Sequence, residues 1–320
     1  MTATATLDPN LETELEIDCI DLEAGFMADT GEELCVGGRI MGAADTPVVV
    51  VLGGISADRH VADSACGAGW WRDFTGGNGP LDPNGCRILS IDFVADASAH
   101  FPSTRDQAAA ILALADAAGV DRLSVIGSSY GGMVALALAS IAPERIEKAL
   151  VISAAHKASA MARAWRSIQR ETVELAIRHG DGKAGLDLAR RLAMTTYRTP
   201  DEIEDRFFEP DPDSRDANGI EAYLECRGAD FTTRMSPERF LALSHSMDGH
   251  EVDLSTIECE VTYVAVREDR LVPIEQIRSA ADQTPKSRFL ELTSYYGHDA
   301  FLKEVDAISS ILAGFTGAGR

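Results

Sequence analysis

The sequence predicts an α/β fold in which a mostly parallel central sheet carries an inserted helical lid. Along the first and last parts of the chain, unbroken apolar runs alternate with helical patterns. Such runs are typical of strands that are covered on both faces. Between these parts, residues 158–250 contain helical patterns and few β-branched runs. We therefore expect a core formed by residues 1–157 and 251–320, with residues 158–250 as the lid.

The elements of the predicted core follow one another in chain order. After a polar stretch to about residue 11, residues 15–40 alternate enough to suggest early antiparallel strands. Buried strands are then predicted at six apolar runs, residues 47–52, 87–92, 123–127, 148–153, 261–266 and 289–292. Helical patterns cover residues 104–118, 132–141 and 299–314. This strand–helix alternation predicts a parallel sheet.

Composition and charge narrow the class of protein. The 320 residues are 45% hydrophobic and 25% charged, and no apolar stretch is long enough to cross a bilayer. The net charge of −22 argues against nucleic acid or an anionic membrane as a partner, because both would be repelled. The acidic N-terminal region lacks the pattern of a secretion signal, so we expect a cytoplasmic protein.

The cysteines argue against a disulfide framework and a structural metal. Six cysteines are scattered along the chain without C-x-x-C spacing. That distribution favours reduced thiols packed as small hydrophobes over disulfides or a zinc site. We expect no metal.

One motif predicts a nucleophile. An apolar strand, the turn Gly127-x-Ser129-x-Gly131 and a helix of small residues form the arrangement that raises a serine above the edge of a sheet. Glycine is needed two residues before and after the serine, because larger side chains would collide in so sharp a turn. Ser129 is therefore the predicted nucleophile, and the alternative is an ordinary tight strand-to-helix turn.

A serine hydroxyl needs a base, usually a histidine that a carboxylate supports. Asp269 follows the strand predicted at residues 261–266, and His298 follows the last predicted strand. Both lie in loops at carboxyl ends of strands, where open α/β sheets bind their ligands. Glu268 remains an alternative to Asp269 as the carboxylate.

Attack on an acyl carbon builds negative charge on its oxygen, which hydrogen-bond donors must stabilise. One donor is expected to be the backbone N–H of Tyr130, directly after the nucleophile. The second is expected from the glycine-containing loop after the strand at residues 47–52, at Gly54 or Ile55. The alternative for that loop is a flexible turn.

With these motifs the chain resembles the α/β-hydrolase superfamily and, within it, the MetX-type homoserine O-acyltransferases. The resemblance covers about residues 46–312. The histidine motif and the turn around Ser129 are shared with many hydrolases, whereas the lid motifs and residues 298–302 are narrower. The matching stretches are residues 53–57, 69–71, 79–82, 127–134, 192–198, 221–224, 243–248 and 297–302.

The resemblance implies a two-step acyl transfer that serves methionine synthesis. Acyl-CoA acylates Ser129, CoA leaves as His298 donates a proton, and His298 then deprotonates the hydroxyl of L-homoserine. Acyl-CoA is thus a co-substrate and no cofactor stays bound. The resemblance also implies that Asp299 and Arg170 hold the ammonium and carboxylate groups of the amino acid, and that the protein is a homodimer.

Two segments depart from the family pattern, residues 52–56 and 93–98, and they leave the acyl donor open between acetyl-CoA and succinyl-CoA. Serine also stays open as an alternative acceptor to homoserine. A succinyl carboxylate would need a further cation, for which Arg59 and Arg72 are candidates. The rival functions are a serine hydrolase of the esterase type and a non-catalytic scaffold on the same fold.

Overall fold

The computed structural model describes residues 19–77, 79–96, 101–209 and 219–317, and its centre is an eight-stranded sheet. The strand order is β1-β2-β4-β3-β5-β6-β7-β8. The first two strands run antiparallel to each other, β2 runs antiparallel to β4, and all other neighbours are parallel. The strands are β1 Cys19–Met27, β2 Glu33–Met41, β3 Val48–Leu52, β4 Arg87–Ile91, β5 Leu123–Ser128, β6 Ile146–Ile152, β7 Glu260–Val266 and β8 Ser287–Leu292.

The sheet confirms the predicted fold class. Each of the six apolar runs forms one parallel strand, and the early antiparallel pair precedes them. The predicted polar stretch before residue 11 lies outside the described residues. The helices of the core are α1 Arg72–Thr75, α2 Thr104–Ala117, α3 Tyr130–Ile141, α9 Ile274–Gln283, α10 Ala300–Lys303 and α11 Val305–Thr316, with short 3₁₀ helices at Leu254–Thr256 and Gly297–Asp299.

The unbroken apolar runs are explained by two hydrophobic clusters, one on each face of the sheet. Side chains alternate along a strand, so Val50 and Leu52 join the cluster that contains residues of α2, α3 and α9. Val49 and Val51 join the other cluster, with residues of α1, α10 and α11. Because both faces of the central strands are covered by helices, apolar residues occupy successive positions along these strands.

The last predicted helix, residues 299–314, is wrong in its continuity. The structure has a 3₁₀ turn at Gly297–Asp299, the short α10, and then α11. Glu304 separates the two α-helices with a ψ of 66°, which is outside the helical range. The apolar pattern continues across this break, which is why periodicity alone did not show it.

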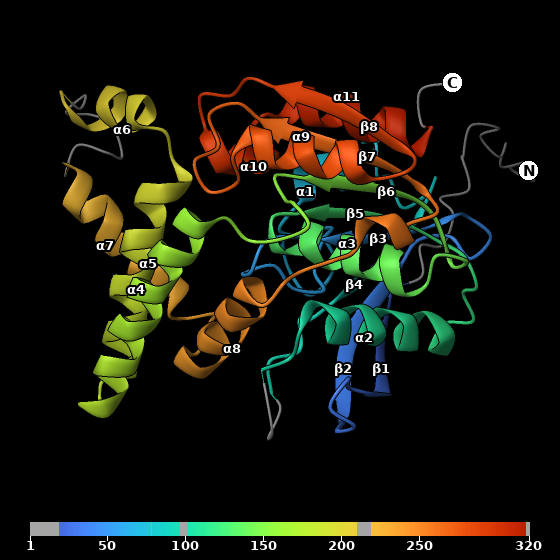
Figure 1. Cartoon of the computed structure of the whole chain (residues 1–320), viewed down its shortest axis with the longest axis horizontal. Helices are drawn as coiled ribbons and strands as arrows, with labels where there is room; N and C mark the ends of the chain where they lie inside the picture. Colours follow the sequence, from blue (N-terminus) through green and yellow to red (C-terminus); the bar gives the residue numbers. More distant parts are fainter. Residues whose placement is uncertain (1–18, 78, 97–100, 210–218, 318–320) are drawn as a thin grey trace, which may run out of the picture.

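A group of helices is inserted between β6 and β7: α4 Ala160–Arg178, α5 Gly182–Tyr197, α6 Pro200–Phe207, α7 Gly219–Phe231 and α8 Pro237–Asp248. Figure 1 shows them gathered at one side of the sheet, with α4 and α5 lying against each other. Side-chain caps define their starts. Ser159, Asp181, Thr199 and Ser236 each accept a hydrogen bond from a first-turn N–H.

Candidate active site

Ser129 lies between β5 and α3 in a strained backbone conformation, with φ 55° and ψ −120°. A positive φ is unfavourable for a residue with a side chain and costs about 1–3 kcal/mol. A Cβ on Gly127 would lie 2.2 Å from the carbonyl oxygen of Gly131, and one on Gly131 would lie 2.4 Å from that of Leu52. Only glycine fits at both positions, so the turn has the tight geometry that its sequence predicts.

The structure brings together the three predicted catalytic residues. The hydroxyl of Ser129 lies 2.8 Å from Nε2 of His298, and Nδ1 of His298 lies 2.7 Å from Oδ2 of Asp269. With the proton on Nδ1, the ring donates to Asp269 and leaves Nε2 free to accept from Ser129. This chain of hydrogen bonds is the arrangement that lets an imidazole remove a serine proton.

The structure decides between the two neighbouring carboxylates. Asp269 is nearly fully buried beside His298, and it also accepts the backbone N–H groups of Leu271 and Val272, at 2.8 and 3.1 Å. Glu268 instead accepts the N–H of Ser294 at 2.8 Å. These backbone bonds fix the Asp269 carboxylate in position and keep Glu268 away from the imidazole.

The environment of His298 makes it a stronger base. Burial by itself lowers the pKa of His298, but the charge of Asp269 and the hydrogen bond to it raise the pKa, and Asp299 adds to the rise. The net result is a pKa above the ordinary value of 6.5. Since the imidazolium form is stabilised, His298 is well suited to hold a proton between two steps of a reaction.

The predicted oxyanion donors lie beside Ser129. Tyr130 is the first residue of α3, so its N–H is one of the first-turn donors that have no acceptor within the helix. The N–H of Gly131 donates to the carbonyl of Gly53 at 2.9 Å, which holds the loop after β3 against the turn. In that loop, the Cβ position of Gly54 would be 3.9 Å from Cβ of Ser129.

A small cavity of about 50 Å³ opens at these groups. From the core, Ile55, Ser129, Tyr130 and His298 line it. The inserted helices complete its wall with Trp165, Arg166, Gln169, Tyr197 and Phe240. The site is therefore a mostly apolar chamber between core and inserted helices that a small acyl group or part of an amino acid can fill.

Neither of the two predicted substrate-binding residues lines the cavity itself, and their surroundings differ. Asp299 is buried next to His298, and its carboxylate lies 3.1 Å from Nε of Arg198. Arg170 does not line the cavity, because its Nη1 lies 2.7 Å from Asp248 and 3.0 Å from the hydroxyl of Ser244. Its assignment to the substrate carboxylate is therefore not supported by the geometry.

Arg166 is the residue that sequence reasoning missed. It lies one helical turn before Arg170 on α4 and lines the cavity. The signal was present, since arginines four positions apart share one face of a helix. The sequence pattern could not show which of the two faces the cavity.

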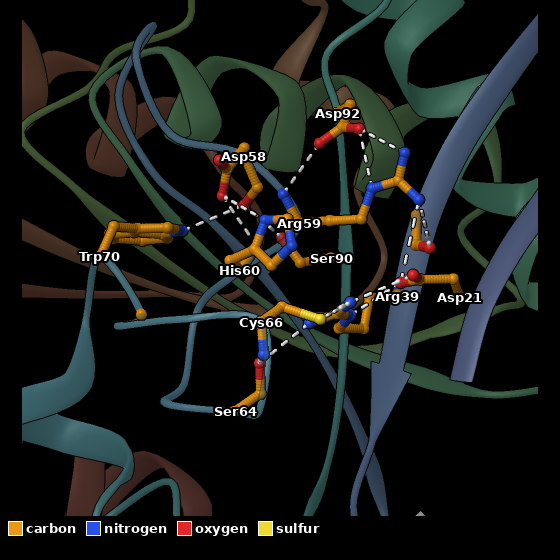
Figure 2. A network of polar contacts seen from close by, with 12 residues as sticks. Asp21, Arg39, Asp58, Arg59, His60, Ser64, Cys66, Trp70, Ser90 and Asp92 are labelled. Carbon is orange, nitrogen blue, oxygen red and sulfur yellow. Dashed lines mark hydrogen bonds and ion pairs between the residues drawn. The ribbon is translucent and has the colours of Figure 1, made fainter. Parts of the chain in front are cut away.

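Arg59 and Arg72, the candidates for a succinyl carboxylate, also lie outside the cavity. Figure 2 shows the Arg59 side chain directed to Asp92, with Nη2 2.6 Å from that carboxylate. Arg72 pairs with Asp63 at 3.0 Å. Each guanidinium is already neutralised by a carboxylate of the chain, so neither is placed to bind an acyl group on Ser129.

Several classes of site are not found in the described residues. They contain no group of three His, Cys, Asp or Glu side chains that could hold a metal ion. No helix in the described part of the chain is long and apolar enough to span a membrane. All six cysteines are free thiols.

Comparisons with known proteins identify the family. A family model of the α/β hydrolase fold matches residues 47–305. Homoserine O-succinyltransferase of Xanthomonas campestris pv. campestris is 42% identical over 282 residues, which are 86% of this chain and 76% of the relative. Homoserine O-acetyltransferase of Deinococcus radiodurans is 31% identical over 288 residues, which are 82% of this chain and 80% of the relative.

Solved structures agree with this result. The crystal structure of homoserine O-acetyltransferase from Staphylococcus aureus has a TM-score of 0.78 and 25% identity, and covers 95% of this chain and 96% of its own. Esterase E22 has a TM-score of 0.81 at 18% identity, covering 94% of this chain and 100% of its own, and shows the fold alone. The resemblance carried by the sequence motifs is confirmed. The chain belongs to the α/β-hydrolase superfamily and, within it, to the homoserine O-acyltransferase family.

Proposed function

We propose that this protein transfers an acyl group from acyl-CoA to the hydroxyl of L-homoserine through an acyl-serine intermediate, in methionine biosynthesis. The observation that carries the proposal is the hydrogen-bonded chain from Ser129 through His298 to Asp269 in a member of this family. Acyl-CoA enters as a co-substrate, and no resident cofactor is needed because the serine itself carries the acyl group.

In the first step, His298 removes the proton of Ser129 while the serine oxygen attacks the thioester carbon. The backbone N–H of Tyr130 and one from Gly54 or Ile55 stabilise the negative charge on the carbonyl oxygen. When the carbon–sulfur bond breaks, His298 gives its proton to the departing CoA thiolate. The products of this step are acyl-Ser129 and free CoA.

In the second step, His298 takes the hydroxyl proton of homoserine, whose oxygen attacks the acyl-serine carbonyl. The bond to Ser129 then breaks and the serine oxygen recovers the proton from His298. Asp269 keeps the imidazole in one orientation through both steps and stabilises its charged form. Asp299, beside His298, is proposed to hold the substrate ammonium group.

Transfer requires that water be kept from the acyl-enzyme. We assign this task to the inserted helices, residues 158–250, as a lid on the core. Trp165, Tyr197 and Phe240 come from these helices and cover the small cavity above Ser129. A cavity of about 50 Å³ leaves little room for water once an acyl group is in place.

The bulky CoA portion of the donor needs more space than this cavity offers. A neighbouring cleft of about 680 Å³ shares Ile55 with it and has a size typical of ligand sites. Trp70, Arg234 and Arg239 line the cleft. Arg239 forms no ion pair with a carboxylate of the described residues. Arg234 is paired with Asp230 at 2.7 Å, so we assign this cleft to the CoA portion with Arg239 as the residue that would bind its phosphates.

A homodimer and a cytoplasmic location complete the proposal. On α4, Met161, Ile168 and Leu175 are each more than half exposed and follow one another at intervals of seven residues. Such spacing places them along one face, and an exposed apolar face favours association. The free cysteines fit a reducing compartment.

The experiment that tests the function compares CoA release from acetyl-CoA and succinyl-CoA with and without homoserine. Without homoserine, we expect the release of one CoA per protein molecule, together with an acyl adduct in the intact mass. Once homoserine is added, CoA release should become continuous. The rival esterase activity would give equal continuous release in both cases. Absence of any adduct would contradict the acyl-serine step.

A further inference from the structure

Two buried arginines of the lid share a single carboxylate. Arg166 and Arg170 on α4 both contact Asp248 at the end of α8, at 2.6 and 2.7 Å. The three side chains are only 10–13% exposed. No other described carboxylate forms an ion pair with either arginine. The cluster therefore carries one excess positive charge, which is costly to bury without a further anion.

The unused hydrogen-bonding capacity lies on Arg166. Its Nε donates to Asp248 at 2.6 Å, whereas its Nη2, which lies 2.6 Å from the same carboxylate oxygen and is sealed from solvent, makes no hydrogen bond. This nitrogen therefore has an ion-pair partner but still has a hydrogen bond to donate. Arg166 lines the same cavity as Ser129 and His298. Arg170 does not, and its Nη1 contacts Asp248 and the hydroxyl of Ser244.

We propose that Arg166 is a carboxylate-binding residue for the acyl donor and makes this enzyme selective for succinyl-CoA over acetyl-CoA. The inference rests on the acyl transfer proposed above. In a succinyl-serine, a free carboxylate follows the acyl carbon by two methylene groups. That anion would neutralise the excess charge of the cluster and accept the unused N–H. An acetyl group has no charge to neutralise the cluster and no carboxylate oxygen to accept the hydrogen bond from Arg166.

The acceptor also carries a carboxylate, and another arginine is available for it. Arg190 on α5 lies over the ring of the cavity residue Tyr197, at 5.3 Å from its centre. Arg190 makes no ion pair with a carboxylate in the described ranges. Since Arg59 and Arg72 are paired elsewhere, Arg166 is the buried arginine that lines the cavity itself. The 42% identical relative is named a succinyltransferase, in agreement with this assignment.

The test measures the donor step alone. Without homoserine, the rate of acyl-Ser129 formation is followed by intact mass for succinyl-CoA and acetyl-CoA, in the native protein and in Arg166→Gln. We expect the native protein to prefer succinyl-CoA by about 100-fold, and Arg166→Gln to lose about that factor with succinyl-CoA, the size of a lost charged hydrogen-bond pair. Its rate with acetyl-CoA should stay within about threefold, since that group makes no bond to the guanidinium. Arg166→Lys should recover part of the loss.

Two controls separate this role from a structural one. Arg163→Gln removes an exposed arginine of the same helix and should change neither donor rate. Arg170→Gln removes the excess charge of the cluster but keeps the Arg166 guanidinium, so it should lower the rate with succinyl-CoA less than Arg166→Gln does. Equal losses for both donors in Arg166→Gln, or no preference in the native protein, would overturn the inference. If the native protein forms no adduct with either donor, the proposed function itself falls.

Discussion

At the scale of single residues, Ser129 has a strained backbone conformation, and in this conformation its hydroxyl lies beside His298. Its φ of 55° is held by the hydrogen bonds around the turn, among them the N–H of Ser129 to the carbonyl of Ile152 at 2.9 Å. The serine hydroxyl adds little to packing, because its one side-chain hydrogen bond goes to His298. A change that removes only the hydroxyl therefore separates chemistry from folding.

We expect Ser129→Ala to abolish acyl-enzyme formation and to lower CoA release by about 10³-fold or more, as for other serine nucleophiles. The melting temperature should change by no more than a few degrees, since no cavity or buried charge is created. Intact mass and CoA release with a thiol reagent measure the first effect, and circular dichroism the second. Turnover in a folded Ser129→Ala protein would disprove the role of this serine.

The raised pKa of His298 predicts the acid limb of the pH profile. The base works only when neutral, so acylation should fall as the pH drops through the pKa of His298, which lies above 6.5. Asp269→Asn removes the charge that raises this pKa, so the limb should move to lower pH while the rate at its plateau falls steeply. Pre-steady-state CoA release between pH 5 and 9 measures both effects. On the acid limb, the rate should change by about tenfold per pH unit. A limb that does not move in the variant would contradict the assignment.

Asp299 gives a prediction about the acceptor. Because Asp299 is buried beside His298, which lines the cavity, Asp299→Asn should raise the KM for homoserine by about tenfold or more, the size expected for a lost charged hydrogen bond. The rate of acylation by the donor should change little, and its acid limb should move slightly to lower pH, because Asp299 makes only a minor contribution to the raised pKa of His298. Steady-state kinetics with each substrate varied separately tests this. An unchanged KM for homoserine would show that Asp299 serves only its ion pair with Arg198.

At the scale of elements, two neighbouring stripes of α4 have different tasks. One stripe lines the cavity with Trp165, Arg166 and Gln169, while the stripe beside it exposes Met161, Ile168 and Leu175. The exposed apolar side chains of Met161, Ile168 and Leu175 are unusual, because most other residues of α4 are polar or small. A partner that covers this stripe would bury apolar area worth about 25 cal/mol per Å².

We expect Ile168→Glu to shift the protein from dimer to monomer, because a carboxylate at the centre of the apolar stripe would be buried in the interface. Light scattering after size exclusion measures the mass at several concentrations. Lys183→Glu on α5 changes an exposed charged position outside the stripe and serves as the control. A native protein that is monomeric at all concentrations would remove the proposed dimer.

At the scale of the whole molecule, the site is formed by segments far apart in the chain. Ser129, Asp269 and His298 lie at the carboxyl ends of β5, β7 and β8, and the lid adds its wall from the insertion between β6 and β7. Figure 1 shows the lid helices meeting the sheet at that side. The cleft assigned to CoA likewise combines core residues after β3 with Arg234, which precedes α8, and Arg239 of α8.

For a protein of net charge −22, an anionic donor must be attracted locally. We therefore expect Arg239→Gln to raise the KM for acyl-CoA by about tenfold and to leave that for homoserine unchanged. Raising the salt concentration should weaken the donor's binding less in the variant than in the native protein. Arg105→Gln, an exposed arginine away from the cleft, is the control. Equal donor KM values in all three proteins would place CoA elsewhere.

The sequence by itself determined the fold class, the order of the parallel strands in the chain, the turn at Ser129 and the family. These features follow from local sequence patterns. Apolar runs predict strands that are covered on both faces, and glycines that no other residue can replace predict the sharp turn. Such patterns do not depend on distant partners. The acid–base partners of Ser129 followed from their order along the chain and their position after strands.

Only the tertiary structure decided which neighbouring side chain faces the site. Asp269 rather than Glu268 meets His298 because Leu271 and Val272 hold it there. Arg166 rather than Arg170 lines the cavity because the rotation of α4 on the core selects one turn of the helix. Arg59 does not reach the site because it binds Asp92, which is 33 residues away in the sequence. Ion pairs of this kind join distant segments, and their geometry is fixed by packing, which a local pattern does not contain.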